Sequence, residues 1–442
     1  MASTSRQPVG NREEPFALRR LGLVMSPRDG DPLEVEGAFN PAAARGPDGE
    51  LYLFPRLVSA GNYSRIGIAR VRFSADGDPV GVERLGIALE PGEPYEKNPW
   101  TGGGCEDPRV TYLEPFHCYL MTYTAYSPEG PRIALAASTD LITWERLGLA
   151  CFTRMGAVDF TDIDNKDALV FPRFIPDPRD GVPSVGFIHR PLFEQERFSP
   201  SSAMSPLERA SMWISYCHQP ATLEHLCGLH SHHRLMSPRA DWERTKIGGG
   251  VPPVLTRHGW LVMYHGVSPD AGNPSHFRYA AGALILDADH PERICYRSKR
   301  PVLTPDAEPL IARGANFVFP TAADCRDDIG QPDRIDVYYG IADRSIGVAS
   351  LTVPAYLDTV AEGSDELRDD LTFGWGPVAT KPQTNKQERE TAMVKDPVCG
   401  MEVDPEKSQH KSEYAGTIYH FCSGGCKRAF DAEPSKYTSP AM

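Results

Sequence analysis

The chain has 442 residues, of which 40% are hydrophobic and 24% are charged, and its formal net charge is -13 at pH 7. This length exceeds most single cores, so it predicts two or three domains, or one large repeat-built domain with a smaller one. Affinity for nucleic acid depends on clustered Lys and Arg, which an acidic chain of this kind lacks overall. We therefore expect no nucleic-acid partner, and any anion that binds must meet a local cluster of positive charge.

The first 20 residues, MASTSRQPVGNREEPFALRR, lack the apolar core of a signal peptide, and no later stretch is long and apolar enough to cross a membrane. The ten cysteines are spread thinly over a long chain, which favours reduced thiols over a disulfide framework. These observations predict a cytoplasmic protein without membrane contact.

Short runs rich in Tyr, Phe, Val, Ile and Leu recur between about residues 37 and 355, separated by Gly, Pro, Asp and Asn. Several alternate with period two, which is typical of β-strands, and long amphipathic helical patterns are nearly absent. In chain order, strands are expected at residues 50–58, 117–126, 132–139, 184–191, 259–267, 279–286 and 334–342. The repeated order of strand, turn and strand indicates an all-β fold and favours radially repeated blades over a sandwich or a barrel.

The stretch GGGCEDPR, residues 102–109, combines conformationally free glycines with a proline and charged side chains. Glycine permits positive φ or a close approach of the backbone, and proline restricts the exit of a turn. We therefore predict a shaped loop that displays Glu106, Asp107 and Arg109. From these residues alone, Asp107 is either a catalytic acid or a carboxylate paired with Arg109.

Glycoside chemistry needs an acid near the departing oxygen, and hydrolysis usually needs a second carboxylate. When phosphate is the nucleophile, cations and hydroxyl donors must position it instead. Basic and hydroxyl side chains that could do so are scattered through the β-rich region; taken singly, each could equally be an unrelated surface group. They are Lys166, Arg173, Arg190, Lys246, His265 and Tyr279.

A series of blocks in a fixed order resembles glycoside hydrolase family 130, the β-mannoside phosphorylases and related β-mannosidases. The blocks are FNPAAA, GCEDPR, DNKDALVFP, HRP, KIGGGVPP, GWLVMYHGV, YAAGALILD and VYYGIADRSIGVA, within about residues 20–355. The resemblance implies a five-bladed β-propeller with a central pocket. It also implies a glycoside phosphorylase that converts a β-mannoside and inorganic phosphate, with inversion, to α-mannose 1-phosphate and a shortened acceptor sugar.

The resemblance also assigns roles to residues. Asp107 stands at the catalytic acid, which acts through a mannosyl hydroxyl, and Glu106 is expected to support it. Phosphate contacts are implied for Lys166, Arg190, Lys246, His265 and Tyr279. Contacts to the sugar are implied for Asn40, Arg56, Arg109 and Asp343. Because the hydrolytic members tend to lose the basic set, its presence favours phosphorolysis.

The segment from about residue 192 to 240 is longer and more irregular than the resemblance leads us to expect, which leaves the acceptor sugar open. It is rich in side chains that can bind metals, but their spacing matches no recognised ligand pattern, so we predict a solvated loop. These side chains are His218, His225, Cys227, His230, His232 and His233.

Residues 361–393 are polar, charged and poor in large apolar side chains, as expected of a linker. From Val394 the chain resembles the YHS domain, a small αβ module associated with metals, through the blocks DPVCGM, GTIYHFC and FCSGGC. Thiolates bind soft or borderline metals, so Cys399, Cys422 and Cys426 are candidate ligands of Zn, Cu or Fe, with His420 as a fourth. The alternative is a small fold whose cysteines are only buried or redox-labile.

The sequence thus predicts a propeller at residues 1–360, a linker at 361–393 and a YHS-like module at 394–442. The expected partners are a β-mannoside oligosaccharide and inorganic phosphate. A homo-oligomer, formed through the N-terminal arm or the 192–240 segment, is an alternative to a monomer. Two other functions are weighed against the phosphorylase: a β-mannosidase using water at the same pocket, and a non-catalytic sugar-binding propeller whose output is a metal-responsive module.

Overall fold

The computed structural model describes residues 14–98, 102–155, 160, 163–193, 209–270, 272, 276–305 and 317–358 of the β-rich part. Towards the C-terminus it describes residues 394–398, 402–403, 405, 408, 410–421 and 424–438. The predicted linker at 361–393 lies outside the described residues. Between residues 14 and 358 the described elements are β-strands and short 3-10 helices, which confirms the prediction of a mostly β fold.

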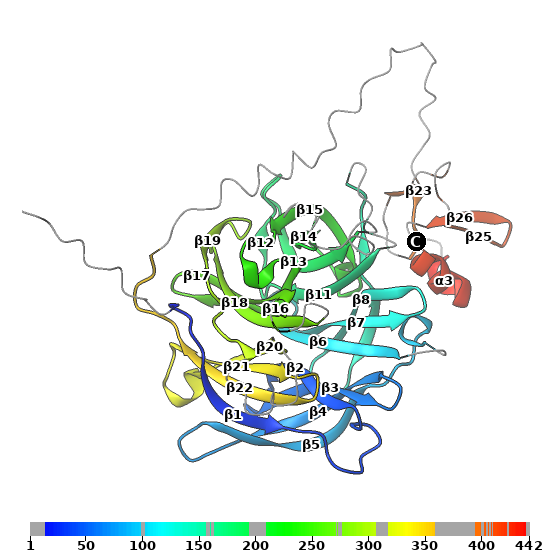
Figure 1. Cartoon of the computed structure of the whole chain (residues 1–442). Coiled ribbons are helices and arrows are strands. Elements are labelled where there is room, and N and C mark those ends of the chain that lie inside the picture. Colours follow the sequence, from blue (N-terminus) through cyan, green and yellow to red (C-terminus); the bar gives the residue numbers. More distant parts are fainter. Residues whose placement is uncertain are drawn as a thin grey trace, which may run out of the picture.

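The strands of the β-rich part form antiparallel groups that follow the chain, as Figure 1 shows by colour. The largest sheet has eight strands: β2 (Gly37–Arg45), β3 (Leu51–Ser59), β4 (Tyr63–Phe73), β5 (Pro79–Leu89), β6 (Gly103–Leu113), β7 (Cys118–Ser127), β8 (Gly130–Ser138) and β9 (Glu145–Leu149). Its two antiparallel halves, β2–β5 and β6–β9, are joined by a short parallel pairing of β4 with β6. We call these halves units 1 and 2.

Three further sheets complete the β-rich part. Unit 3 contains β10 (Cys151–Phe152), β11 (Asp164–Val170), β12 (Ile175–Pro176), β13 (Pro183–Leu192), β14 (Met212–His218) and β15 (Gly228–Met236). Unit 4 contains β16 (Lys246–Thr256), β17 (Gly259–Pro269), β18 (Phe277–Leu286) and β19 (Ile294–Arg297). Unit 5 contains β20 (Val318–Cys325), β21 (Arg334–Ile341), β22 (Ser345–Thr352) and β1 (Arg19–Met25).

Short 3-10 helices lie between the strands: η1 (Pro94–Glu96), η2 (Glu114–Phe116), η4 (Glu224–Cys227), η5 (Asp241–Glu243) and η8 (Arg326–Ile329). The first strand, β1, pairs with β22, so the start of the β-rich part is hydrogen-bonded to its end. In Figure 1 the blue strands accordingly lie beside the yellow ones.

Five clusters of buried apolar side chains hold successive units together. Leu120 and Phe187 belong to the cluster between units 2 and 3, and similar clusters join units 1 and 2, 3 and 4, and 4 and 5. The fifth cluster joins Leu53 of unit 1 to Val348 of unit 5. One strand of each unit also contacts the corresponding strand of the next: β2, β6, β11, β16 and β20 contact one another in this order, and β20 contacts β2. Packing therefore links the five units in a closed cycle, with these five inner strands next to one another.

Two sequence predictions are corrected by the strands. Residues 103–109 of GGGCEDPR are not a loop but the start of β6. Within the segment predicted as a solvated loop, residues 212–218 and 228–236 are β14 and β15, and His232 is buried. Both strands pair inside unit 3, so their histidines face protein groups and not only water. For example, Ser215 Oγ lies 2.7 Å from His189 Nε2 and 2.8 Å from His232 Nδ1.

The C-terminal part contains two small hairpins and helices: β23 (Val394–Lys395) with β24 (Glu402–Val403), β25 (His410–Tyr414) with β26 (Thr417–Phe421), and then α3 (Gly424–Ala432) and α4 (Pro434–Tyr437). Phe421 and Phe430 are buried in its small core. No described helix of the chain is both long and apolar enough to traverse a lipid bilayer.

Candidate active site

Each inner strand carries a β-bulge, an irregularity that inserts extra residues and bends the strand. In three of them the bulge holds an Asn or Asp with positive φ: Asn40 at 44°, Asp107 at 46° and Asp167 at 59°. These two residue types tolerate the left-handed region better than most others, because their short side chains can hydrogen-bond locally. The bulges therefore turn polar side chains of different strands toward a common region.

The glycines of GGGCEDPR let β6 approach its neighbour. Gly104 has a φ of 107°, and a Cβ atom there would lie 2.1 Å from the carbonyl oxygen of Ser64. Only glycine fits such a contact, which lies beside the parallel pairing of β4 with β6. The glycine signal in the sequence thus reflects close strand packing next to Asp107.

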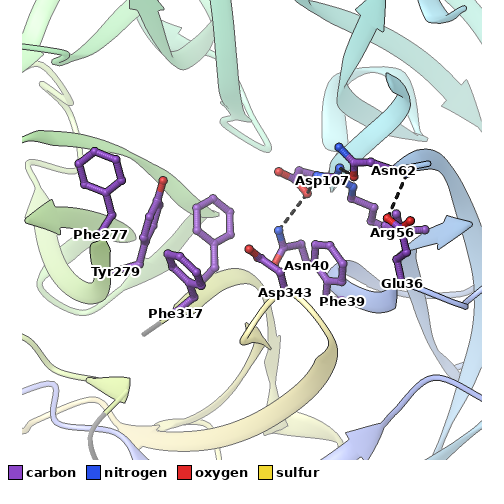
Figure 2. Close-up of a pocket in the computed structure, with 12 residues that line it drawn as sticks. Glu36, Phe39, Asn40, Arg56, Asn62, Asp107, Phe277, Tyr279, Phe317 and Asp343 are labelled. Atoms are coloured by element: carbon purple, nitrogen blue, oxygen red, sulfur yellow. Dashed lines mark hydrogen bonds and ion pairs between the residues drawn. The ribbon is translucent and has the colours of Figure 1, made fainter. Parts of the chain in front are cut away.

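A cavity of about 430 Å³ opens where the inner strands meet (Figure 2). Five residues that the sequence assigned to the site line it: Asn40, Arg56, Asp107, Tyr279 and Asp343. The other lining residues were not predicted, and they include a group of aromatic rings that a sugar face can pack against. They are Glu36, Phe39, Val58, Asn62, Phe277, Phe317 and Phe319.

The carboxylate of Asp107 is held by groups from two other strands, β2 and β3. Its Oδ1 accepts a hydrogen bond from Asn40 Nδ2 at 2.9 Å and one from Arg56 Nη1 at 3.3 Å. Figure 2 shows the carboxylate facing Asn40 and the cavity. Burial alone would raise the pKa of Asp107, but the positive charges of Arg56 and Arg109 and the Asn40 hydrogen bond lower it below its usual range. These neighbours therefore favour the ionised form of the Asp107 carboxylate.

Glu106 supports this arrangement from the adjacent position. Its Oε1 accepts a hydrogen bond from Arg56 Nη2 at 2.9 Å, and its Oε2 lies 3.6 Å from Lys166 Nζ. Arg56 also donates from Nε to Ser64 Oγ at 2.9 Å, and its guanidinium lies over the Phe39 ring. The carboxylate of Glu106 thus fixes two cations and is itself 4% exposed, so it is placed as a support beside the cavity.

Arg109 is not among the residues that line the cavity, and it is 2% exposed. It donates to the backbone carbonyls of Gly250 at 2.8 Å, Gly249 at 3.2 Å and Asp107 at 2.5 Å. Its side chain therefore ties the backbone that carries Asp107 to β16. Asp107 and Arg109 are joined through this carbonyl, whereas the sequence alternative was a pairing of their two side chains.

Four of the five predicted phosphate contacts have Asp167 as a charged neighbour: Arg190, Lys246, His265 and Tyr279. Asp167 is a buried carboxylate that the sequence reasoning missed although it follows Lys166 directly. The ammonium of Lys166 lies instead beside Glu106. Asp167 Oδ2 accepts a hydrogen bond from Arg190 Nε at 2.7 Å and lies 3.8 Å from His265 Nε2. Burial would raise the pKa of Asp167, but Arg190, His265 and Arg109 lower it. This carboxylate stays ionised and holds Arg190 in place.

Tyr279 connects this basic set to the cavity. It lines the cavity, stacks on His265 with ring centroids 5.9 Å apart, and has Lys246 Nζ 5.5 Å from its own centroid. Arg173 lies elsewhere, against the Trp260 ring. The structure therefore brings together Lys246, His265 and Tyr279 beside Arg190, next to the wall formed by Asp107.

Burial controls the protonation of these groups. It lowers the pKa of Lys246 to about 7, with help from the neighbouring charge of Arg190. It lowers the pKa of His265 to about 3 and raises that of Tyr279 to about 12. His265 is therefore neutral at pH 7, and its buried Nδ1 has no hydrogen-bond partner among the described residues. Lys246 is the cation of this set whose charge changes near neutral pH.

Asp343 lies in the turn between β21 and β22 and lines the cavity, where Figure 2 shows it next to Asn40. Its φ of 49° is again left-handed. Burial, and next the negative charge of Asp107, raise its pKa above the usual range. These two carboxylates of the cavity thus differ, although Glu36 also lines it: the environment favours the charged form of Asp107 and disfavours that of Asp343.

Of the predicted metal ligands, Cys399 and Cys422 lie outside the described residues. Cys426 is buried on α3, and its Sγ lies 3.8 Å from the Sγ of Cys151 on β10. His420 lies half-buried on β26. Of the histidines weighed as metal ligands, His218 lies near the carboxylates of Asp177 and Asp180, where its Nε2 contacts Asp177 Oδ2 at 2.6 Å.

The sequence was compared with known families and structures. Residues 7–362 match the model of a glycoside hydrolase 130 family described as beta-1,4-mannooligosaccharide phosphorylase. The chain belongs to this family. Residues 394–441 match the model of the YHS domain.

Individual relatives agree with these matches. A 1,2-beta-oligomannan phosphorylase from Thermoanaerobacter is 28% identical over 342 residues, which cover 76% of this chain and 97% of the relative. The solved structure of a beta-1,2-mannobiose phosphorylase from Listeria innocua, in complex with beta-1,2-mannobiose, shares the fold with a TM-score of 0.55. Its identity is 23%, and the match covers 75% of this chain and 94% of the other. A copper-transporting P-type ATPase from Rhizobium leguminosarum is 48% identical over 46 residues, 10% of this chain and 6% of the relative.

Proposed function

We propose that this chain is a β-mannoside phosphorylase, which uses inorganic phosphate to convert a β-mannoside to α-mannose 1-phosphate and a shortened acceptor, with inversion. The observation that carries the proposal is the position of the Asp107 carboxylate in a sugar-sized cavity that adjoins the buried basic set around Asp167. In its protonated form a carboxyl group can supply a proton to the departing oxygen, and neighbouring cations can bind an anionic nucleophile such as phosphate. The names of the relatives support the same reaction.

We infer that the scaffold is a five-bladed β-propeller. The support is the closed cycle of five packed units, in which the inner strands β2, β6, β11, β16 and β20 contact one another and β1 pairs with β22. Such an arrangement places the inner strands of all blades around one axis. It explains why residues as far apart in sequence as Asn40 and Asp343, 303 positions, line the same cavity.

In the proposed reaction the mannosyl unit occupies the cavity, with Asn40, Arg56 and Asp343 as its polar contacts. Phosphate, held by Lys166, Arg190, Lys246, His265 and Tyr279, attacks the anomeric carbon from the face opposite to the acceptor. The bond from this carbon to the acceptor oxygen breaks, a bond to a phosphate oxygen forms, and the acceptor oxygen gains a proton. Hydrogen phosphate loses one proton overall, so Asp107 ends the cycle as it began.

Protonation of Asp107 follows from the arrival of phosphate. The ligand-free site keeps this carboxylate ionised, chiefly through Arg56 and Arg109 acting against burial. Bound phosphate adds negative charge next to it, which raises the pKa of a carboxylate. Asp107 is then able to take a proton and pass it, through a mannosyl hydroxyl, to the departing oxygen. Arg109 serves as a positioning residue for Asp107.

The proposal retains three further predictions. The domains are residues 1–360, 361–393 and 394–442, in agreement with the two family matches. The C-terminal module binds Zn, Cu or Fe, as its cysteines and the similarity to part of a copper-transporting ATPase suggest. The protein acts in the cytoplasm, with a homo-oligomer as an open alternative to a monomer.

The test is incubation of the purified protein with β-1,2- and β-1,4-mannobiose and longer β-mannosides, with and without inorganic phosphate, followed by phosphorus and proton NMR. The expected result is α-mannose 1-phosphate that forms only with phosphate and is absent for Asp107→Asn. That variant keeps an acceptor oxygen for Asn40 but cannot deliver a proton. Free mannose released without phosphate would instead identify a β-mannosidase, and sugar binding without any turnover would identify a binding protein.

A further inference from the structure

Two cysteines from different parts of the chain meet away from the active site. Cys151 lies on β10 in unit 3, Cys426 lies on α3 of the C-terminal module, and they are 275 positions apart in sequence. Their sulfur atoms are 3.8 Å apart, and both residues are buried, with 7% and 4% of their surface exposed. Together with Phe421 and Phe430 they form one apolar cluster. The contact between the β-rich part and the module is therefore centred on thiols.

The position of Cys151 follows from its short strand. β10 pairs in parallel with β15 through Cys151 and Gly228, and the next residue, Phe152, packs inside unit 3 against Phe160 and His189. Successive side chains of a strand point to opposite faces. The ring of Phe152 thus anchors β10 in the catalytic part, while the thiol of Cys151 faces the module.

The separation of the sulfur atoms matches shared coordination of a metal. A tetrahedral ion bonds thiolate sulfur at about 2.3 Å, which places two sulfur ligands about 3.8 Å apart. A disulfide requires about 2.05 Å, so it would need these atoms to move together by nearly half their present separation. Soft and borderline ions such as Cu⁺ and Zn²⁺ favour thiolate ligands, and an apolar surrounding shields the bonds from water.

We propose that Cys151 and Cys426 are two ligands of one thiophilic metal ion, which joins the catalytic part to the C-terminal module. Binding forms two metal–sulfur bonds and releases one proton from each thiol, without oxidation of either sulfur. The module's sequence offers Cys399 and Cys422 as further ligands, but the proposal rests on the two described thiols. The metal is then a structural link between the two parts, with one ligand that a YHS module alone does not contain.

Cobalt(II) titration of the reduced, metal-free full chain tests the proposal, because each cobalt–thiolate bond adds to a charge-transfer band in the near ultraviolet. The wild-type chain is expected to bind one cobalt ion with this band. Cys151→Ser is expected to weaken the band and to lower the affinity for cobalt more than about tenfold, since it removes a ligand. The control is Cys295→Ser, which removes a half-buried thiol on β19 that packs in a different cluster.

Thermal unfolding with and without Zn²⁺ provides a second measurement that does not depend on catalysis. The metal is expected to stabilise the wild-type chain and Cys295→Ser, but Cys151→Ser less. Cys151→His, which keeps a ligand at this position, should recover part of the affinity with a weaker thiolate band. The proposal is wrong if Cys151→Ser binds cobalt as the wild type does, if the wild-type chain binds none, or if non-reducing peptide mapping finds Cys151 and Cys426 joined by a disulfide.

Discussion

In the proposed phosphate site, Lys246 is expected to make phosphate binding depend on pH. Burial, with the nearby charge of Arg190, brings its pKa to about 7 in the ligand-free site. Its pKa is depressed, so the side chain is a cation below pH 7 and becomes neutral as the pH rises above 7. Bound phosphate attracts the ammonium form. Above pH 7, binding must therefore first protonate Lys246, and phosphate affinity falls.

The size of the effect follows from the fraction of Lys246 that is protonated. When phosphate binds only to the protein with Lys246 in its ammonium form, the apparent dissociation constant of phosphate is multiplied by 1 + 10^(pH − 7). This factor is about 1.1 at pH 6 and about 11 at pH 8. The KM for phosphate should thus rise about tenfold across this range because of Lys246 alone.

The assay compares the phosphate KM of the wild-type enzyme and Lys246→Arg from pH 6 to pH 8, at saturating β-mannoside. Arginine stays charged throughout, and the ionisation of phosphate itself affects both proteins equally. The ratio of wild-type KM to variant KM should therefore rise about tenfold with pH, whatever its starting value. A ratio that stays constant would refute the argument that the charge of Lys246 is lost near neutral pH in the free site.

Three substitutions test other parts of the structure. In Gly248→Ala the added Cβ would lie 2.4 Å from Asp167 Oδ2 and 2.4 Å from His265 Cε1. These two side chains must then shift, so kcat/KM for phosphate should fall about 10- to 100-fold. Unchanged kinetics, or an equal loss in the control Gly228→Ala, where the added Cβ has room, would contradict this expectation. In Arg109→Lys a single ammonium nitrogen cannot span the three carbonyls that Nε, Nη1 and Nη2 of the guanidinium reach. Urea unfolding should therefore show a loss of about 2–4 kcal/mol and kcat should also fall, whereas wild-type values for both would exclude the positioning role. Arg326→Met removes the guanidinium whose Nη1 lies 2.7 Å from the buried Asp336 carboxylate. Thermal or urea unfolding should show a loss of about 3–5 kcal/mol, with kcat/KM unchanged in the folded enzyme. A smaller loss would mean that Arg334 alone is enough to balance the charge of Asp336.

The outer strands of the units could be predicted from the sequence, because each has one face in an apolar cluster and keeps the usual strand composition. The predicted runs at 117–126 and 279–286 correspond to β7 (Cys118–Ser127) and β18 (Phe277–Leu286). β14 and β15 were missed because four histidines interrupt the apolar pattern of β15 and its preceding turn. These histidines are accommodated by hydrogen bonds such as that from His232 Nε2 to Thr153 O. The two residues are 79 positions apart, so no local sequence pattern predicts this bond.

The inner strands were harder to predict, since their sequences contain the residues that usually end a strand. β16 begins KIGGGVPP, and β6 contains GGCEDPR. Five residues that the sequence analysis assigned to the site line the cavity. That assignment depended on the resemblance to family blocks and not on the pattern of strands. The aromatic wall, with Phe277 and Phe317, could not be foreseen, because it forms only when units 4 and 5 meet.

The unusual composition of the inner strands and the location of the cavity have one physical cause. Proline has no N–H to donate, so within a strand it is tolerated at an edge or a bulge. Pro41, Pro108 and Pro320 each lie at the bulge of an inner strand, and in the first two cases directly follow the left-handed Asn40 and Asp107. A bulge breaks the regular alternation of side chains and bends the strand. Three units use such a break to place a polar side chain, Asn40, Asp107 or Asp167, at or beside the cavity. The positions of these strands that look least like a strand in the sequence are therefore those that build the site.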